Sequence, residues 1–209
     1  AKPSLEKPSP LALDLACDTG LIASALARKY PHAEIRGFDL NPAYVDAARA
    51  RCAGGKVTLA EADLAERIPC EDESCDLIAA FDILHCMPDS ERFLAEVRRC
   101  LREGGRFVGA FRCIDGEDDD CALYADLAAE RGYLLLPFFG ICELLATSGF
   151  VVEYMTPKFE AIPGITGKAA EKMLDPVWRE LNAAVSAEGG QPENVSHGFV
   201  RMAARRQTV

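Results

Sequence analysis

The sequence predicts an α/β protein with a doubly wound, mostly parallel sheet. Short apolar runs alternate with segments of helical spacing over residues 11–111, and such alternation produces parallel strands joined by right-handed crossovers. The first run, Leu11 to Leu15, ends in the turn-like Asp18-Thr19-Gly20 and is followed by apolar residues at helical spacing. Because ligands of such folds bind at the carboxyl ends of the strands, this turn is the first candidate for a site.

The later elements follow the same alternation. Asn41 and Pro42 supply an N-cap and a first-turn proline for a helix that reaches about Cys52 and ends at Gly54-Gly55. A break at Gly104-Gly105 precedes another strand. The predicted strands are residues 11–15, 34–40, 56–61, 76–81, 106–111, 151–154 and 197–203. The predicted helices are the one that follows Gly20 and those at residues 42–52, 91–101, 121–131, 141–148 and near 167–187.

The length and composition favour one domain. A chain of 209 residues with 49% hydrophobic content can bury one substantial core. We expect a flexible tail over residues 1–10 and a single domain over 11–209. The acidic stretch 115–120 is interpreted as a solvated loop and helix N-terminus.

The charge pattern disfavours nucleic-acid and membrane partners. The net charge is -10 and the pI is near 4.9, which opposes binding to phosphate backbones. The obvious basic cluster, Arg201, Arg205 and Arg206, is interpreted as a solvated strand end. The sequence contains no run of about 18 apolar residues, so no membrane span is expected. It does not begin with a secretory signal. We expect a cytoplasmic protein, or an organellar one if a targeting segment preceded Ala1.

Nine cysteines indicate a reducing compartment with mostly free thiols. They form no CxxC pair and no regular interval, and several lie in apolar runs. Metal binding is the alternative, but none of the three histidines lies at ligand spacing from a cysteine, so no metal is expected. The cysteines are Cys17, Cys52, Cys70, Cys75, Cys86, Cys100, Cys113, Cys121 and Cys142.

The turn after the first strand resembles motif I of class I S-adenosylmethionine-dependent methyltransferases. That motif has an acidic residue followed by three alternate glycines. Here Asp14 is the acidic residue, Ala16 and Asp18 replace the first two glycines, and Gly20 keeps the third. The resemblance implies that this loop, with Cys17, lines the cofactor site. Asp18 would either repel the cofactor's carboxylate or pair with its ammonium group.

Five further matches follow in collinear order, and with the first motif they resemble the small-molecule, UbiE-like branch of the family over about residues 11–111. Asp39 ends the second strand, where it would bind the ribose hydroxyls, and Asp63 would meet the adenine amino group. Residues 68–78, 81–89 and 101–108 resemble the family's lead into strand four, its "LHHxxD" region and its "LkpGG" break. The predicted cofactor-binding residues are Asp14, Ala16, Cys17, Asp18, Gly20, Asp39, Leu40, Asp63, Leu64, Phe81 and Leu84.

The resemblance implies a seven-stranded sheet with an antiparallel last strand, a cofactor half over 11–111 and a substrate-facing half over 112–209. A helical insertion at about 161–196 is longer than the hairpin usual in this fold, and it would either cap the substrate pocket or mediate dimerisation. The partner is expected to be a small-molecule methyl acceptor, bound by a monomer or homodimer. Six apolar residues are expected to line the acceptor pocket or to belong to the core: Tyr133, Leu135, Phe138, Phe139, Met155 and Phe159.

His85 is the predicted catalytic residue. Its ordinary pKa near 6.5 suits removal of a proton from an oxygen or nitrogen nucleophile. The other interpretation is a hydrogen-bonded wall of the pocket.

Two competing functions are considered beside methyl transfer. A nicotinamide-binding oxidoreductase would need glycines where Ala16, Asp18 and Leu21 stand. A degenerate methyltransferase domain that acts as a ligand-binding or interaction module is suggested by Asp18 and by the short segment before the first strand.

Overall fold

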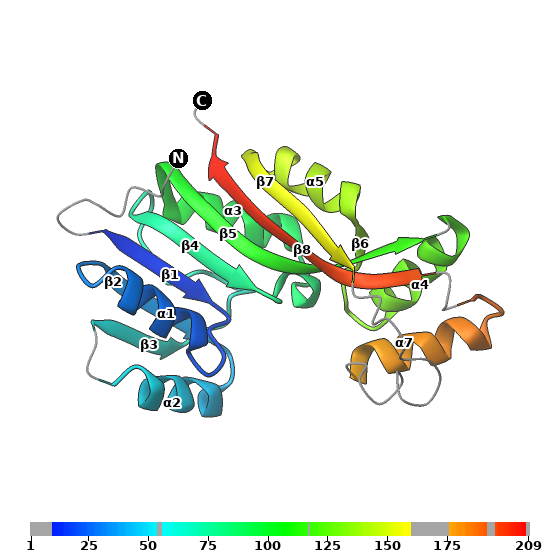
Figure 1. Cartoon of the computed structure of the whole chain (residues 1–209), viewed down its shortest axis with the longest axis horizontal. Coiled ribbons are helices and arrows are strands. Elements are labelled where there is room, and N and C mark those ends of the chain that lie inside the picture. The colour runs from blue at the N-terminus through cyan, green and yellow to red at the C-terminus, as the bar shows by residue number, and fades with distance from the viewer. Residues whose placement is uncertain (1–9, 54–55, 117, 160–175, 192–194, 208–209) are drawn as a thin grey trace.

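The computed structural model describes residues 10–53, 56–116, 118–159, 176–191 and 195–207. One twisted sheet runs through the molecule with helices packed against it (Figure 1). The strands are β1 (Leu11–Leu15), β2 (Glu34–Asp39), β3 (Val57–Glu61), β4 (Cys75–Phe81), β5 (Leu101–Gly116), β6 (Leu136–Pro137), β7 (Phe150–Phe159) and β8 (Val195–Arg206). The helices are α1 (Leu21–Lys29), α2 (Pro42–Arg51), α3 (Ser90–Cys100), α4 (Asp118–Glu130), α5 (Phe138–Thr147) and α7 (Pro176–Ala187), with the short 3₁₀ turn η1 (Leu84–Cys86).

The strand order is β3-β2-β1-β4-β5-β8-β7. Strands β1 to β5 pair in parallel, whereas β8 is antiparallel to both β5 and β7. This confirms the predicted fold class and its antiparallel last strand. An eighth strand, the two-residue β6, pairs with β5 and was not predicted. The order reverses between β1 and β4, so the carboxyl ends of these neighbours form the crevice where such folds bind ligands.

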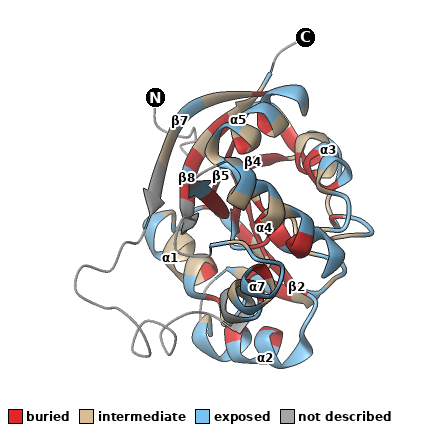
Figure 2. Ribbon diagram, turned by 90° about the vertical axis from the view of Figure 1, so that its right-hand side faces the viewer, coloured by how far each residue is buried: buried red, intermediate tan, exposed pale blue. Residues whose placement is uncertain are grey.

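Two cores cover the two faces of the sheet. Leu11, Leu13 and Leu15 of β1 pack in the core that also holds residues of α3 and α5. Ala12 lies in the opposite core, with residues of α1 and α2. This period-2 alternation explains why every residue of β1 is buried. Figure 2 shows buried residues along the strands and on parts of the helices, whose other parts are exposed.

The helix boundaries follow the predicted capping residues. The Asn41 side chain accepts a hydrogen bond from the Ala43 amide at 3.0 Å and caps α2. Asp89 caps α3 in the same way, through the Arg92 amide at 2.8 Å. Gly149 follows α5 with a φ of 81°, a left-handed conformation that ends a helix at little cost only in glycine.

Two predicted boundaries are wrong. The Gly104-Gly105 break lies inside β5, where the register with β4 shifts between Cys75 and Leu77, because the sheet absorbs the extra residues as an irregularity. The acidic stretch 115–120 was predicted to be a solvated loop and helix N-terminus; the helix N-terminus is confirmed, but Asp115 continues β5 and pairs with Ser196. Helix α4 then begins at Asp118, three residues before the predicted start, since acidic side chains are favourable in a first helical turn.

The C-terminal arginines are not a purely solvated strand end. Arg206 donates to the Leu101 carbonyl at 2.6 Å and forms an ion pair with Glu73 at 2.7 Å. Arg205 lies 3.8 Å from Glu153 of β7. These contacts tie the end of β8 to the elements around it.

Some predicted segments lie partly or wholly outside the described residues. Residues 1–9 of the predicted tail, Gly54-Gly55, and residues 160–175 and 192–194 of the predicted insertion lie outside them; helix α7 occupies part of the insertion. All nine cysteines are free thiols. In the described ranges, no helix has the length and apolar character needed to cross a membrane.

Candidate active site

The loop between β1 and α1 has a left-handed backbone at every second residue. Ala16, Asp18 and Gly20 have φ angles of 54°, 46° and 79°. These are the three positions at which the resembling motif has glycine. The loop therefore keeps the glycine-type backbone although two of its three positions have side chains, and each non-glycine residue held there is strained.

Gly20 is required for a second reason. A Cβ built on it would lie 2.9 Å from the Cβ of Ala48 on α2, closer than side-chain carbons pack. The first turn of α1 therefore rests directly against α2. This close approach explains why the third glycine is the one retained.

The buried Asp14 side chain binds the first turn of α1. Its side chain is 1% exposed, and its Oδ2 accepts a hydrogen bond from the Ala23 amide at 2.8 Å. Burial raises the pKa of Asp14 to about 7, against the lowering effect of that amide. Cys17 is also buried, and its amide donates to the Phe38 carbonyl at 2.9 Å. Burial raises the pKa of the Cys17 thiol to about 12, so it is a packing thiol.

Asp39 joins the loop after β1 to the loop after β2. Its Oδ2 accepts from the Asp18 amide at 2.9 Å and its Oδ1 from the Asn41 amide at 2.9 Å. An ionised carboxylate has about four acceptor positions, so each oxygen retains capacity for one further donor. Two neighbouring hydroxyl groups of a ribose would satisfy it. The hydrogen-bond acceptors of Asp39 at the end of β2 therefore fit the predicted cofactor.

Apolar side chains are exposed around the same edge of the sheet. Leu21 at the start of α1 is 61% exposed, Leu40 after β2 is 69% exposed and Phe81 at the end of β4 is 38% exposed. Exposed large apolar groups near a switch-point crevice are typical of a surface that a ligand covers.

The remaining predicted cofactor residues differ in accessibility. Asp63 is exposed and its Oδ1 accepts from the Ala65 amide at 2.9 Å, which fixes the turn after β3. Leu64 and Leu84 are 5% and 3% exposed and pack in the main core, so they offer a ligand little side-chain surface.

His85 lies in η1, directly after β4, and is 5% exposed. Its Nδ1 is 3.5 Å from Oδ1 of Asp82, and its Nε2 is 3.2 Å from the Cys86 sulfur. The imidazole stacks on Tyr133 with ring centroids 6.1 Å apart. The backbone carbonyl of His85 accepts a hydrogen bond from the Leu134 amide at 2.8 Å. The ring is therefore held between a carboxylate and a thiol.

Asp82 and Arg112 form an ion pair that sequence reasoning missed. Arg112 on β5 donates through Nε and one terminal nitrogen to the two Asp82 oxygens, at 2.7 and 2.9 Å, and the guanidinium is almost buried. Asp82 has a φ of 55°, a conformation that concentrates at functional sites. The available signal was a charged residue, Arg112, inside the apolar run Phe111 to Ile114.

Other features do not add to this site. Within the part of the chain that the structure describes, no group of three or more His, Cys, Asp or Glu side chains is arranged to hold a metal ion. A surface hollow of about 680 Å³ runs along α3 and the end of α5, and none of its lining residues is a predicted site residue.

Comparison with protein families supports the resemblance found in the sequence. Residues 12–105, a little under half of the chain, match the family described as a methyltransferase domain. Over these residues the chain is similar to methyltransferases. The matched region includes most of β1, all of β2 to β4, and α1 to α3; Asp14 lies in β1, Asp39 ends β2 and Asp63 lies in the loop after β3.

Relatives with similar sequences are methyltransferases. The phthiotriol/phenolphthiotriol dimycocerosates methyltransferase of Mycobacterium tuberculosis is 37% identical over 117 residues, which are 56% of this chain and 42% of that protein. The ubiquinone/menaquinone biosynthesis C-methyltransferase UbiE of Desulfotalea psychrophila is 35% identical over 103 residues, 49% of this chain and 40% of that protein. The matches thus span less than half the length of these relatives.

Solved structures confirm the fold. A crystal structure from Bacillus halodurans, described as a methyltransferase, has a TM-score of 0.73 at 22% identity and covers 97% of this chain and 94% of its own. Geranyl diphosphate C-methyltransferase from Streptomyces coelicolor has a TM-score of 0.70 at 15% identity, covering 95% of this chain and 73% of its own.

Proposed function

We propose that this methyltransferase domain binds S-adenosyl-L-methionine and transfers its methyl group to a small-molecule acceptor. The observation that carries the proposal is the loop after β1, whose left-handed backbone at Ala16, Asp18 and Gly20 lies beside the Asp39 carboxylate. The match of residues 12–105 to a methyltransferase domain favours this function over the nicotinamide hypothesis, and nothing in the fold or the relatives favours the interaction-module hypothesis.

The residues at the strand ends would divide the cofactor between them. Asp39 would hold the ribose hydroxyls through its remaining acceptor positions. The exposed Leu40 would cover one face of the adenine, and Asp63 would accept from its amino group. When bound, the cofactor supplies an electrophilic methyl group on a sulfonium centre.

His85 is proposed as the residue that takes a proton from the acceptor. Asp82 faces Nδ1 at 3.5 Å, which favours the tautomer with its proton on Nδ1 and leaves Nε2 as the basic nitrogen. Arg112 holds Asp82 through two hydrogen bonds and thereby fixes the carboxylate that orients the ring. The relatives named above are, by their names, a methyltransferase of phthiotriol and phenolphthiotriol dimycocerosates and a C-methyltransferase of ubiquinone/menaquinone biosynthesis. A small apolar acceptor with an ionisable group is proposed here.

The cellular setting is also a proposal. The acidic net charge of -10 supports a small-molecule acceptor rather than a nucleic acid. The free thiols of all nine cysteines support a reducing compartment such as the cytoplasm. A monomer or a homodimer is compatible with the proposed site.

Calorimetric titration with S-adenosylhomocysteine tests the cofactor site. Saturable binding is expected, and a folded chain that does not bind would refute the proposal. A second assay incubates the protein with methyl-labelled cofactor and a panel of quinol, lipid and small amine acceptors. Transfer of label to one class would identify the acceptor.

A further inference from the structure

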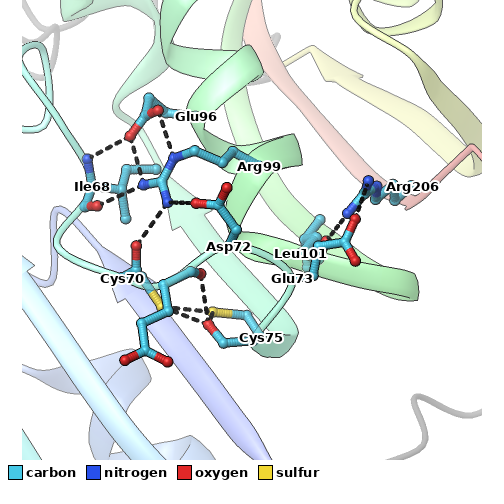
Figure 3. A network of polar contacts seen from close by, with 11 residues as sticks. Ile68, Cys70, Asp72, Glu73, Cys75, Glu96, Arg99, Leu101 and Arg206 are labelled. Atoms are coloured by element: carbon cyan, nitrogen blue, oxygen red, sulfur yellow. Dashed lines mark hydrogen bonds and ion pairs between the residues drawn. The ribbon is translucent and has the colours of Figure 1, made fainter.

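Three thiols meet at the edge of the sheet where β4 begins. Cys70 lies in the loop after β3, Cys75 is the first residue of β4 and Cys100 is the last residue of α3. The sulfurs of Cys70 and Cys75 are 3.1 Å apart, and Cys100 lies close enough to lower the pKa of the Cys70 thiol. Figure 3 shows the Cys70 and Cys75 side chains directed toward each other.

Access to the three thiols is unequal. Cys75 and Cys100 are 0% exposed, whereas Cys70 is only partly buried. A dissolved oxidant can therefore reach the Cys70 sulfur first. Cys75 lies directly behind it, in contact and shielded from solvent.

The position of Cys70 is fixed by Arg99 of α3. The guanidinium donates to the Cys70 carbonyl at 2.8 Å and to the Ile68 carbonyl at 3.0 Å. It also binds the carboxylates of Asp72 and Glu96, each at 2.7 Å (Figure 3). The loop that contains Cys70 is thus clamped to α3, and the two sulfurs are held together by the fold.

Charge and hydrogen bonding distinguish the two thiols chemically. Hydrogen bonds from Cys100 and then Cys75 lower the pKa of the Cys70 thiol well below its usual range, helped by Ser74 and by the charge of Arg36. The same contact raises the pKa of Cys75. Because the thiolate is the reactive form of cysteine, Cys70 has the properties of an attacking thiol and Cys75 those of its partner.

We propose that Cys70 and Cys75 form a redox site that peroxides oxidise to an intramolecular disulfide. The Cys70 thiolate attacks one peroxide oxygen; the O–O bond breaks, and the departing hydroxide takes up the proton released by Cys70. The resulting sulfenic acid is attacked by the Cys75 sulfur, the S–O bond breaks, and the hydroxyl leaves as water with the Cys75 proton. Two thiols and one peroxide thus give one disulfide and two waters.

This site is separate from the methyl-transfer site. Cys75 lies at the amino end of β4, whereas Phe81 and the predicted site residues lie at its carboxyl end. The proposal therefore does not depend on the proposed function, and its test does not require enzymatic activity.

Peptide mapping of the chain after treatment with hydrogen peroxide tests the site. Free thiols are alkylated, and the denatured chain is cleaved after glutamate. Cleavage at Glu71 and Glu73 separates Cys70 from Cys75, so a disulfide between them links two peptides. The second peptide also contains Cys86, because the next glutamate is Glu91; the linked peptides are therefore found by mass, and fragmentation assigns the disulfide to Cys75. The expected result is this linked pair, which dithiothreitol converts back to two free thiols.

Three variants complete the test. Cys70→Ser and Cys75→Ser should lose the linked pair, whereas Cys142→Ser should keep it, because the Cys142 thiol faces Met155 and not a second thiol. Cys75→Ala replaces Cys75→Ser if the buried serine hydroxyl prevents folding. The mapping of the wild-type chain tests the proposal even if neither Cys75 variant folds. A Cys70–Cys100 disulfide, random pairing, or stable oxidation of Cys70 without a linked partner would each overturn the proposal.

Discussion

The buried carboxyl group of Asp14 should make the stability of the domain fall as the pH rises toward neutrality. Burial raises the pKa of Asp14 from 3.8 to about 7 in the folded chain, so the folded state retains a proton that the unfolded state loses. The stabilisation is fully present below about pH 4 and is lost as the pH rises through about 7. The two pKa values correspond to a loss of at most about 4 kcal/mol.

The variant Asp14→Asn removes this titration and keeps an oxygen that can accept from the Ala23 amide, 2.8 Å away in the wild type. The free energy of unfolding in urea should be similar for the two proteins near pH 4.5. At pH 7.5 the variant should be the more stable, by about 3 kcal/mol, because the wild type loses about 1.4 kcal/mol for each pH unit between 4.5 and the Asp14 pKa of about 7. The informative quantity is the difference between the two proteins, since other acidic groups contribute equally to both.

Asp46→Asn is the matched control, because Asp46 is an exposed carboxylate of the neighbouring helix α2 and forms an ion pair with Arg49 at 2.9 Å. Its stability curve should run parallel to that of the wild type. If Asp14→Asn also gives a parallel curve from pH 4.5 to 7.5, then Asp14 is ionised at low pH in the folded chain. The account of Asp14 as a desolvated anchor would then be wrong.

Three further changes test the site. Asp39→Ala should weaken binding of S-adenosylhomocysteine by about 1 to 3 kcal/mol, the value of charge-assisted hydrogen bonds; unchanged affinity in calorimetry would mean that the ribose lies elsewhere. Gly20→Ala should lower the urea midpoint by an amount equivalent to about 2 kcal/mol or more, because the new methyl group meets Ala48 and the backbone is left-handed; an unchanged midpoint would contradict the close packing. His85→Gln should reduce methyl transfer about 10²- to 10⁴-fold at unchanged cofactor affinity if His85 is the base; loss of cofactor affinity instead would make it a wall of the pocket.

The local part of this structure was predictable because local signals dominate there. Asn41-Pro42 specifies the start of α2, and the apolar run Leu11 to Leu15 specifies a central strand. The contacts made across the sheet were not predictable in the same way. The Asp82–Arg112 pair joins residues 30 positions apart, and the sequence of either segment contains no information about their register.

The boundaries failed for a related physical reason. Gly104-Gly105 has the composition of a break, but β5 pairs with β4 on both sides of it, at Leu101 and from Arg106 onward, so the break becomes an irregularity inside β5. The cluster of thiols could not be predicted from local sequence either. Cys70 and Cys75 are close in sequence, yet only the packing of α3 and its Arg99 clamp brings Cys100 to them.

The substitution of two glycines in the loop after β1 does not by itself argue against a working site. A left-handed residue other than glycine costs about 1 to 2 kcal/mol, and aspartate tolerates that conformation better than most residues. The contacts that hold the loop, from Asp14 to the Ala23 amide and from Asp39 to the Asp18 amide, involve carboxylates and can offset a cost of this size. The backbone geometry, and not the glycine count, is what a bound cofactor would meet.

The side chain of Asp18 is then the remaining difference from the family motif, and it can be tested alone. Asp18→Asn removes the charge and keeps a residue that tolerates the left-handed backbone, whereas Asp18→Gly removes both the charge and the strain. If Asp18 repels the carboxylate of the cofactor, both variants should bind S-adenosylhomocysteine more tightly, with Asp18→Gly also more stable in urea. If Asp18 pairs with the ammonium group, both should bind more weakly. Equal affinity in all three proteins would mean that the exposed side chain of Asp18 points away from the ligand, and that the loop acts through its backbone alone.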